Sequence, residues 1–138
     1  MSKFPLNFYF TTQDPKFITN TVILSTSDNY ISHVFVKTPI YDFTDKKIGY
    51  KISDDYVRQV EIDKFIVELN NTYYIEGKGT ITWQYFFEND KPTVFYPVNQ
   101  LAVSNIISST GEYFGESGTV SLFPKPDGSR IVNVTFNS

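Results

Sequence analysis

Cysteine is absent from the sequence, and histidine occurs only once, as His33. Without cysteine the chain has no disulfide, no thiolate nucleophile and no cysteine-based zinc site. A serine–histidine–aspartate constellation could form only through His33, and a histidine-based metal site would need its other ligands from acids alone. The Gly-x-Ser-x-Gly motif of many esterases is missing as well. We therefore expect no metal site, and we expect His33 to be an exposed or hydrogen-bonded side chain.

Arginine is scarce too, with Arg58 and Arg130 as its two occurrences, and the formal net charge is −3. Nucleic-acid binding needs basic residues clustered on one face, whereas the lysines here are scattered. No apolar run approaches the length of a membrane span. The first residues lack the basic and long apolar regions of an export signal. We therefore expect no nucleic-acid or membrane partner and a cytoplasmic location.

Aromatic residues are abundant, with 13 Phe and 10 Tyr in 138 residues. A chain of this length is of single-domain size and buries about two thirds of its unfolded surface. Aromatic side chains favour strands, although they would also line a cavity for an apolar ligand. We predict one β-barrel or β-sandwich domain over residues 1–138.

Apolar and polar residues alternate with a period of two through most of the chain, which predicts strands and no helix. Residues 18–26 form an apolar-centred strand candidate. In residues 32–37, Val34 and Val36 share one face, opposite His33 and Phe35. The longest pattern spans residues 79–88 and places four apolar side chains on one face: Ile81, Trp83, Tyr85 and Phe87.

Turn-forming residues predict breaks between these strands at 53–55, at Asn70–Asn71 and at 88–92. Asp54 and Asp55 cannot act as a carboxylate pair in a strand, because adjacent residues point to opposite faces. We expect them to be turn residues or rim charges. Many short strands with turns between them predict an all-β sandwich or barrel. Closure into a barrel leaves no edge strand with unpaired backbone groups that could associate with other chains.

Three glycines, Gly111, Gly115 and Gly118, interrupt a segment that otherwise resembles a strand. They do not form a phosphate-binding loop, because no Lys-Ser/Thr pair and no helix follow, and two nearby glutamates would repel a phosphate. We predict that they turn the chain, with a positive φ at Gly111 and a bend or bulge at the other two. Asp127–Gly128 is the next predicted turn.

The segment NIISSTGEYFGESGTVSLFPKPDGSRIVNVTF, residues 105–136, resembles the C-terminal signature of the allene oxide cyclase and dirigent barrel superfamily. The similarity continues upstream through TPIYDFTDKKIGY and KGTITWQYFF, so it covers roughly residues 34–136. Ser108–Ser109 departs from the Gly-Gly of the family. The resemblance implies a closed antiparallel eight-stranded, calycin-like barrel, often trimeric, that folds a reactive small molecule inside an apolar lumen without metal or organic cofactor.

The resemblance leads to the hypothesis of a cofactor-independent cyclase or isomerase acting on an apolar, polyunsaturated or polyketide-like substrate. Holding a substrate in its reactive shape contributes on the order of 7–11 kcal/mol. Hydrogen-bond donors at developing charge supply the rest. The candidate catalytic residues are Tyr56, Arg58 and Tyr85, and the candidate ligand contacts are Phe35, Tyr41, Trp83 and Phe87.

Several of these candidates have a structural alternative. Arg58 would be a cation within the lumen only if its face of the strand points inward; otherwise it meets solvent or an acid near the rim. Tyr41, with Asp42, matches a Tyr-Asp element that in the family is chiefly a structural turn. Cyclases of the family carry an essential carboxylate on the first strand, where this chain offers only Asp14, beside a proline and so in a turn.

Two other functions fit the same barrel. One is a lipocalin-like carrier that binds a hydrophobic ligand without changing it. The other is a structural or assembly protein whose barrel is filled by its own side chains. For the enzyme and the carrier the expected partners are a small apolar molecule and further copies of the chain, as a dimer or trimer. The structural protein would have no cavity and would form an assembly far larger than a trimer.

Overall fold

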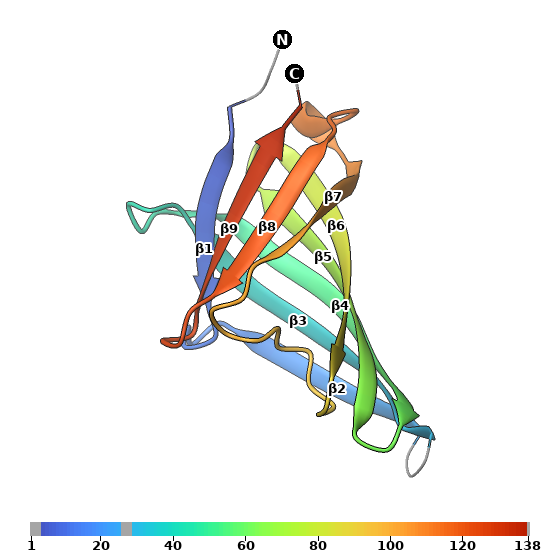
Figure 1. The fold of residues 1–138 in the computed structure, drawn as a ribbon. Coiled ribbons are helices and arrows are strands. Elements are labelled where there is room, and N and C mark those ends of the chain that lie inside the picture. The colour runs from blue at the N-terminus through green and yellow to red at the C-terminus, as the bar shows by residue number, and fades with distance from the viewer. Residues whose placement is uncertain (1–3, 26–28, 138) are drawn as a thin grey trace.

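The computed structural model describes residues 4–25 and 29–137, so the predicted strand end at Thr26 lies outside it. These residues form an all-β structure, and none of its helices is long and apolar enough to cross a membrane (Figure 1). A 3-10 turn, Gly111–Tyr113, lies between β7 and β8. The strands are β1 Leu6–Thr11, β2 Ile18–Ser25, β3 Ile31–Tyr41, β4 Lys47–Glu61, β5 Lys64–Ile75, β6 Gly79–Asn89, β7 Ala102–Ser109, β8 Gly118–Pro124 and β9 Ser129–Phe136.

The sheet closes on itself. Its strand order is β1-β9-β8-β7-β6-β5-β4-β3-β2, and β1 also pairs with β3 through Tyr9 and Tyr41. Strands β1 and β3–β9 therefore form a closed antiparallel eight-stranded barrel, which confirms the predicted fold. The remaining strand, β2, lies along β3 and projects beyond the closed part (Figure 1). All but the last of its side chains are exposed.

Aromatic and acidic side chains hold the seam between β1 and β3. The Tyr9 ring lies 5.6 Å from that of Tyr41 and 5.9 Å from that of Phe43. The Tyr9 hydroxyl donates to Asp45 at 2.6 Å, and the Tyr41 hydroxyl donates to Asp14 at 2.7 Å. These hydrogen bonds to carboxylates are the main reason that the pKa of each tyrosine is raised to about 12. Asp14 lies in a turn, as predicted.

Two predicted turns are wrong. Residues 53–55 lie in the middle of β4, which runs for 15 residues, and Asn70–Asn71 lie within β5, which runs for 12. The two segments pair with each other, Ser53 opposite Asn71 and Asp54 opposite Asn70. The side chains of Asp54, Asp55 and Asn70 find partners on neighbouring strands, so tertiary context overrides the local preference for a turn. The turn at 88–92 is confirmed, because β6 ends at Asn89.

The core fills the closed end of the barrel. Its largest fully buried side chain, Trp83, donates its indole N–H to the Tyr73 hydroxyl at 3.0 Å. Phe8 packs edge-on against Tyr73, with ring centroids 4.9 Å apart. As predicted, Val34 and Val36 share one face of β3, and Ile81 and Trp83 share one face of β6; the structure shows that both faces are buried.

Gly111 lies where two backbones cross. Its φ of +67° confirms the predicted positive φ, and a Cβ placed there would be 2.2 Å from the Lys78 carbonyl oxygen. The chains are drawn together by the Glu112 N–H, which donates to that same oxygen at 2.7 Å. Gly115 also has a positive φ, +78°, but a Cβ there would meet open space. Substitution at Gly115 would therefore introduce conformational strain alone, whereas substitution at Gly111 would introduce both strain and steric crowding.

We predict that Gly111→Ala is more destabilising than Gly115→Ala. The left-handed backbone alone costs alanine about 1–2 kcal/mol, which is the expected loss at Gly115. At Gly111 the crossing strand must also move, so the expected loss is at least about 3 kcal/mol. Urea unfolding of the two variants measures the difference. Equal losses would contradict the role assigned to the crossing.

Candidate functional site

Polar side chains point into the barrel from β4, β5 and β9. Alternation along β4 directs Lys51, Ser53 and Asp55 to the interior, and all three are buried. Asn71 on β5 lies opposite Ser53, and Arg130 enters from β9. The Asn71 side-chain nitrogen is buried and has no hydrogen-bond partner within the part of the chain that the structure describes. Buried polar groups normally have partners, so this cluster differs from an ordinary core.

A cavity of about 30 Å³ lies among these side chains. That volume is room for about one or two water molecules. Its polar lining comprises the lumen residues Lys51, Asp55, Asn71 and Arg130, and apolar lining comes from residues such as Phe10, Tyr73 and Leu122. In this conformation the lumen is therefore nearly filled, although its walls carry ionisable side chains.

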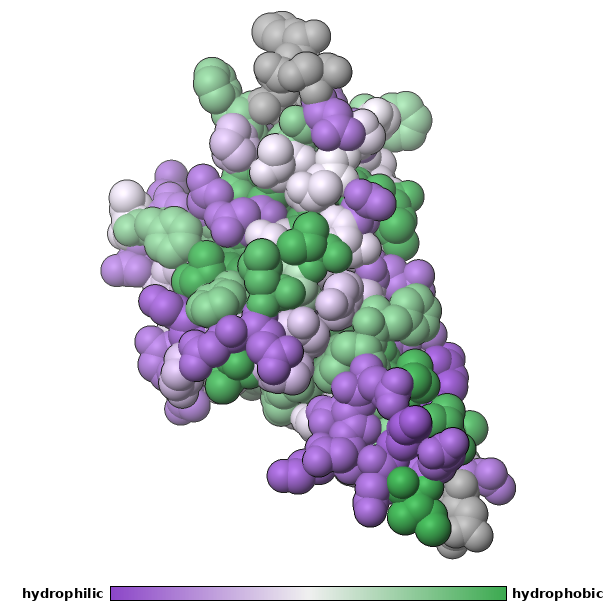
Figure 2. Space-filling view, viewed as in Figure 1, coloured by the Kyte–Doolittle hydropathy of each residue, from purple (hydrophilic) through white to green (hydrophobic). Residues whose placement is uncertain are grey.

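Residues 90–101, between β6 and β7, cover the lumen and are here called the cover segment. Val94, Phe95 and Tyr96 line the cavity. The segment crosses the mouth of the barrel in Figure 1, and Figure 2 shows hydrophobic side chains gathered over the middle of that face. Exposed apolar residues of the segment include Val98 and Leu101.

Aromatic contacts hold the cover segment in place. The Tyr96 ring packs edge-on against Tyr85 and Phe87, with centroids 5.4 Å and 5.1 Å away. The Phe95 ring lies 6.4 Å from Phe17, and the Arg130 guanidinium carbon lies 5.8 Å from its centroid. Phe95 is nevertheless exposed, so much of its surface already faces solvent.

A second cavity, of about 150 Å³, lies on the other side of Val94 and Phe95, which line both. Its walls include Ser32 and Val34, which precede Val36 of the first cavity on the inward face of β3. The Ser32 hydroxyl is buried without a partner in residues 4–25 and 29–137. The two cavities therefore follow one face of β3 and are separated by the cover segment.

Burial shifts the titration of the lumen residues. Desolvation raises the pKa of Asp55 to about 6, against the opposing effects of Lys51, of the Asn70 N–H at 3.1 Å and of the Ser53 hydroxyl at 3.1 Å. Desolvation lowers the pKa of Lys51, opposed by Asp55 and reinforced by Arg130. Burial also lowers the pKa of Arg130, which donates to the Gly128 carbonyl at 2.9 Å. Strongly shifted groups in one cavity mark a candidate functional site.

The structure brings three predicted site residues together on the inward face of β6. Trp83 is core, whereas Tyr85 and Phe87 are half-buried and contact the cover segment. The Tyr85 hydroxyl lies 3.5 Å from that of Tyr96. These residues support the cover segment, but they do not line the small cavity itself.

The other four predicted site residues lie outside the barrel. Val57 takes the inward position on β4, so Tyr56 and Arg58 face outward, and a lumen role would require the opposite face. Arg58 pairs with Glu68 at 3.0 Å, as in the alternative considered above. Phe35 is on the outer face of β3, and Tyr41 belongs to the seam.

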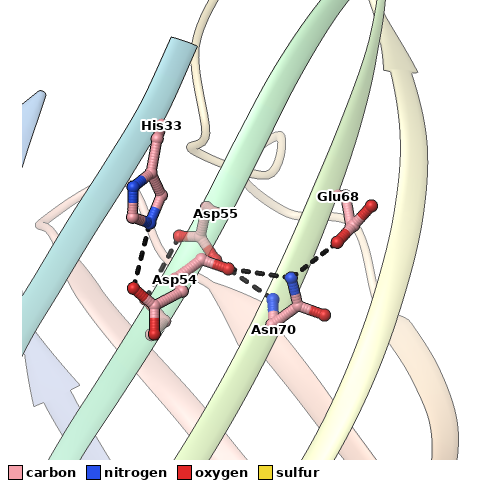
Figure 3. Close-up of polar contacts among 6 residues, drawn as sticks. His33, Asp54, Asp55, Glu68 and Asn70 are labelled. Carbon is pink, nitrogen blue, oxygen red and sulfur yellow. Dashed lines mark hydrogen bonds and ion pairs between the residues drawn. The ribbon is translucent and has the colours of Figure 1, made fainter. Parts of the chain in front are cut away.

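Asp54 and Asp55 point to opposite faces of β4, as the strand geometry requires (Figure 3). They are neither turn nor rim residues, which corrects that expectation. On the outer face Asp54 accepts from His33 at 3.0 Å. The His33 ring stacks on Tyr56, with centroids 4.7 Å apart. His33 is thus a hydrogen-bonded surface residue, and the described residues hold no group of three or more potential metal ligands of the His, Cys, Asp and Glu types.

Sequence reasoning missed Lys51, Asp55, Asn71 and Arg130. The signal was present in the alternation of Lys51, Ser53, Asp55 and Val57, which share one face of a strand. Interpreting residues 53–55 and Asn70–Asn71 as turns broke that face in two. Arg130 follows the correctly predicted turn at Asp127–Gly128, but nothing in its own neighbourhood marks it as buried.

We predict an inverted pH dependence of stability at Asp55. Its folded pKa of about 6 exceeds the ordinary value of 3.8, so the folded state binds the extra proton between these values. Its contribution to the unfolding free energy is greatest in acid and is lost as the pH rises through about 6. Relative to Asp55→Asn, the wild type should lose up to about 3 kcal/mol between about pH 4 and pH 7.

Denaturant unfolding of the two proteins at several pH values measures this difference. Asp54→Asn, on the outer face of the same strand, is the matched control: it retains Asp55 and should lose stability relative to Asp55→Asn as the wild type does. A wild type that gains stability relative to Asp55→Asn over this range would contradict the assignment.

No protein-family model matches the sequence, and no curated protein matches it either. Solved structures do match the fold. The crystal structure of AbnU, an exo-specific intermolecular Diels-Alderase, aligns over 96% of this chain and 96% of its own, with a TM-score of 0.58 and 10% sequence identity. At this identity the likeness shows the fold alone. It supports a barrel of a kind that a cyclising enzyme uses, whereas the specific superfamily named from the sequence is not confirmed.

Proposed function

We propose that the protein is a cofactor-independent cyclase or isomerase that acts on an apolar, polyunsaturated or polyketide-like molecule in the barrel lumen. The observation that carries the proposal is the cluster of Lys51, Asp55 and Asn71 in one cavity. Ionisable groups and an unpaired amide are costly to bury, so a barrel with only a structural role has little reason to keep them.

The fold shared with AbnU supports this proposal. A Diels–Alder reaction rearranges electrons within its reactants, so the protein has only to orient them and stabilise developing charge. A narrow lumen with apolar walls and a few hydrogen-bond donors fits those two tasks. The lumen residues would bind a carbonyl or similar polar group, and the apolar walls would hold the unsaturated chain.

Substrate binding requires the cover segment to move, because the present cavity has only about 30 Å³. Displacement of Val94 and Phe95 would join it to the neighbouring cavity of about 150 Å³. The joined space would follow the inward face of β3 from Val36 to Ser32. Ligand pockets for small molecules typically measure about 300–1,000 Å³, so part of the substrate would also replace the displaced side chains.

The small volume of the lumen favours a second candidate, a structural barrel filled by its own side chains. Such a protein would bind no ligand even with the cover segment opened. A carrier, in contrast, would bind a ligand but leave it unchanged. The following two experiments separate these functions.

We predict that Phe95→Ala strengthens the binding of a conjugated polyene aldehyde such as retinal. Removing the ring joins the two cavities and removes a contact that holds the cover segment. Phe86→Ala is the matched control, because Phe86 is exposed on the outer face of the neighbouring strand. Quenching of Trp83 fluorescence measures binding. No binding by either variant would favour the filled structural barrel.

We predict that the protein directs a model cycloaddition between a conjugated diene and an unsaturated aldehyde toward one stereoisomer. Chiral chromatography with mass detection measures the isomer ratio against the uncatalysed background. Leu122→Trp, which fills the lumen, should restore the background ratio. Phe123→Trp, the neighbouring position on the opposite face of β8, should not. Tight binding without selective product would indicate a carrier.

A further inference from the structure

We propose that Lys51 is a Schiff-base lysine, whose amine condenses with an aldehyde or ketone group of a molecule in the lumen. The inference rests on the lumen as the site of the proposed function, and it names the substrate class as a carbonyl compound. It also assigns a covalent step that the barrel fold by itself does not imply.

The first argument is the position of the amine. Lys51 is 8% exposed and lines the small cavity. Its Nζ lies 4.7 Å from the centroid of the Phe10 ring. It makes no ion pair or hydrogen bond with the residues that the structure describes, whereas Lys47 and Lys64 both pair with glutamates on the surface. Lys51, the only buried lysine among these residues, thus lines a cavity with its amine over the Phe10 ring and free of hydrogen bonds and ion pairs.

The second argument is the chemical state of that amine. Burial disfavours the charged form, and the nearby Arg130 guanidinium acts in the same direction, so the pKa of Lys51 lies below that of an ordinary lysine. A desolvated lysine that loses its proton more readily is the usual nucleophile of Schiff-base chemistry. Asp55 opposes the effect, so both charged groups that face Lys51 have been taken into account.

The third argument is the set of groups around the cavity. Asn71 lies opposite Ser53, the inward residue between Lys51 and Asp55, and cross-strand neighbours of this kind are about 4.5–5.5 Å apart. The unpaired Asn71 N–H group could therefore donate to a carbonyl oxygen beside the lysine. Asp55 lines the same cavity and can hold a proton near neutral pH. The amine of Lys51, the amide of Asn71 and the carboxyl group of Asp55 thus lie at successive inward positions along the paired strands β4 and β5.

The reaction balances with these groups alone. The neutral Lys51 amine attacks the carbonyl carbon, a C–N bond forms, and the oxygen takes a proton to give a carbinolamine. The nitrogen lone pair then expels that oxygen as water, and a protonated imine remains. In total the amine, the carbonyl compound and protonated Asp55 give the iminium ion, water and the Asp55 carboxylate. The iminium withdraws electrons from a conjugated alkene, which would accelerate its cyclisation.

The size of the cavity favours an aldehyde at the end of a chain. A space of about 30 Å³ accommodates a formyl group and little more. The remainder of the molecule would extend past Val94 and Phe95 into the second cavity. The substrate would therefore bind in one orientation, with its carbonyl group in the small cavity.

Reductive trapping tests the proposal. The 138-residue chain and its Phe95→Ala variant are incubated with butanal and sodium cyanoborohydride near pH 7, and modified lysines are identified by peptide mass spectrometry. Lys51 should be alkylated severalfold faster than exposed Lys37, since its lowered pKa leaves more of the amine neutral at this pH. Trapping at Lys51 should fall at lower pH than expected for a surface lysine.

Lys51→Met should lose the fast adduct while Lys37 reacts as before, and circular dichroism verifies that the variant is folded. If Lys51 reacts no faster than Lys37 in both the wild type and Phe95→Ala, the proposal is wrong. Stereoselective cycloaddition without trapping of Lys51 would support the proposed enzyme function and contradict the Schiff-base proposal. Fast trapping without any cyclised product would support the Schiff base and count against the cyclase.

Discussion

Closure of the barrel depends on β1, which pairs along its length with β9 and meets β3 through Tyr9 and Tyr41. Without that contact the sheet would have two free edges and a face open to water. The inward side chains of β4 and β5 would then be solvated, and the desolvation that shifts the pKa values of Lys51 and Asp55 would disappear. The chemistry of the lumen is thus a property of the closed sheet, and Tyr41 contributes to it from outside.

The polar lumen has an energetic cost that the remaining core must offset. Lys51, Asp55 and Arg130 are all buried, yet no close ion pair joins them. The charged form of each side chain is therefore stabilised less than it would be in water. Desolvation of this kind moves the pKa values of acids, bases and nucleophiles toward neutral pH. The fully buried packing of Trp83, Tyr73 and Phe8 at the closed end is well placed to compensate.

A period of two survives in most strands, so the sequence predicted an all-β sandwich or barrel and the side chains that share a face, Val34 with Val36 and Ile81 with Trp83. Turn chemistry predicted the turn after β6 and the positive φ of Gly111, and the closed eight-stranded barrel followed from the family resemblance. The polar cluster in the lumen could not be predicted in this way. Ser53, Asp54 and Asp55 carry a strong local turn preference, and only the pairing of this segment with Asn70 and Asn71 overrides it. That pairing joins residues about one strand-length apart and leaves no trace in either segment alone.

The orientation of the candidate residues Tyr56 and Arg58 could not be predicted, for a related reason. Tyr56 and Arg58 were attractive because aromatic and cationic groups suit catalysis, but a period of two does not reveal which of the two faces points inward. Val57 decides the matter, since its apolar side chain takes the interior position on β4. Tyr85 and Phe87 do face inward, yet their partners in the cover segment come from a stretch without periodicity.

The cover segment lies outside the hydrogen-bonded ladder that defines the barrel. Its contacts with the lumen come from a few side chains, chiefly Phe95 and Tyr96. Substitutions in it can therefore change the size and shape of the cavities without disturbing strand register or closure. Related chains could diverge in selectivity through this short stretch while retaining an unchanged scaffold, and it is the natural place to begin laboratory evolution.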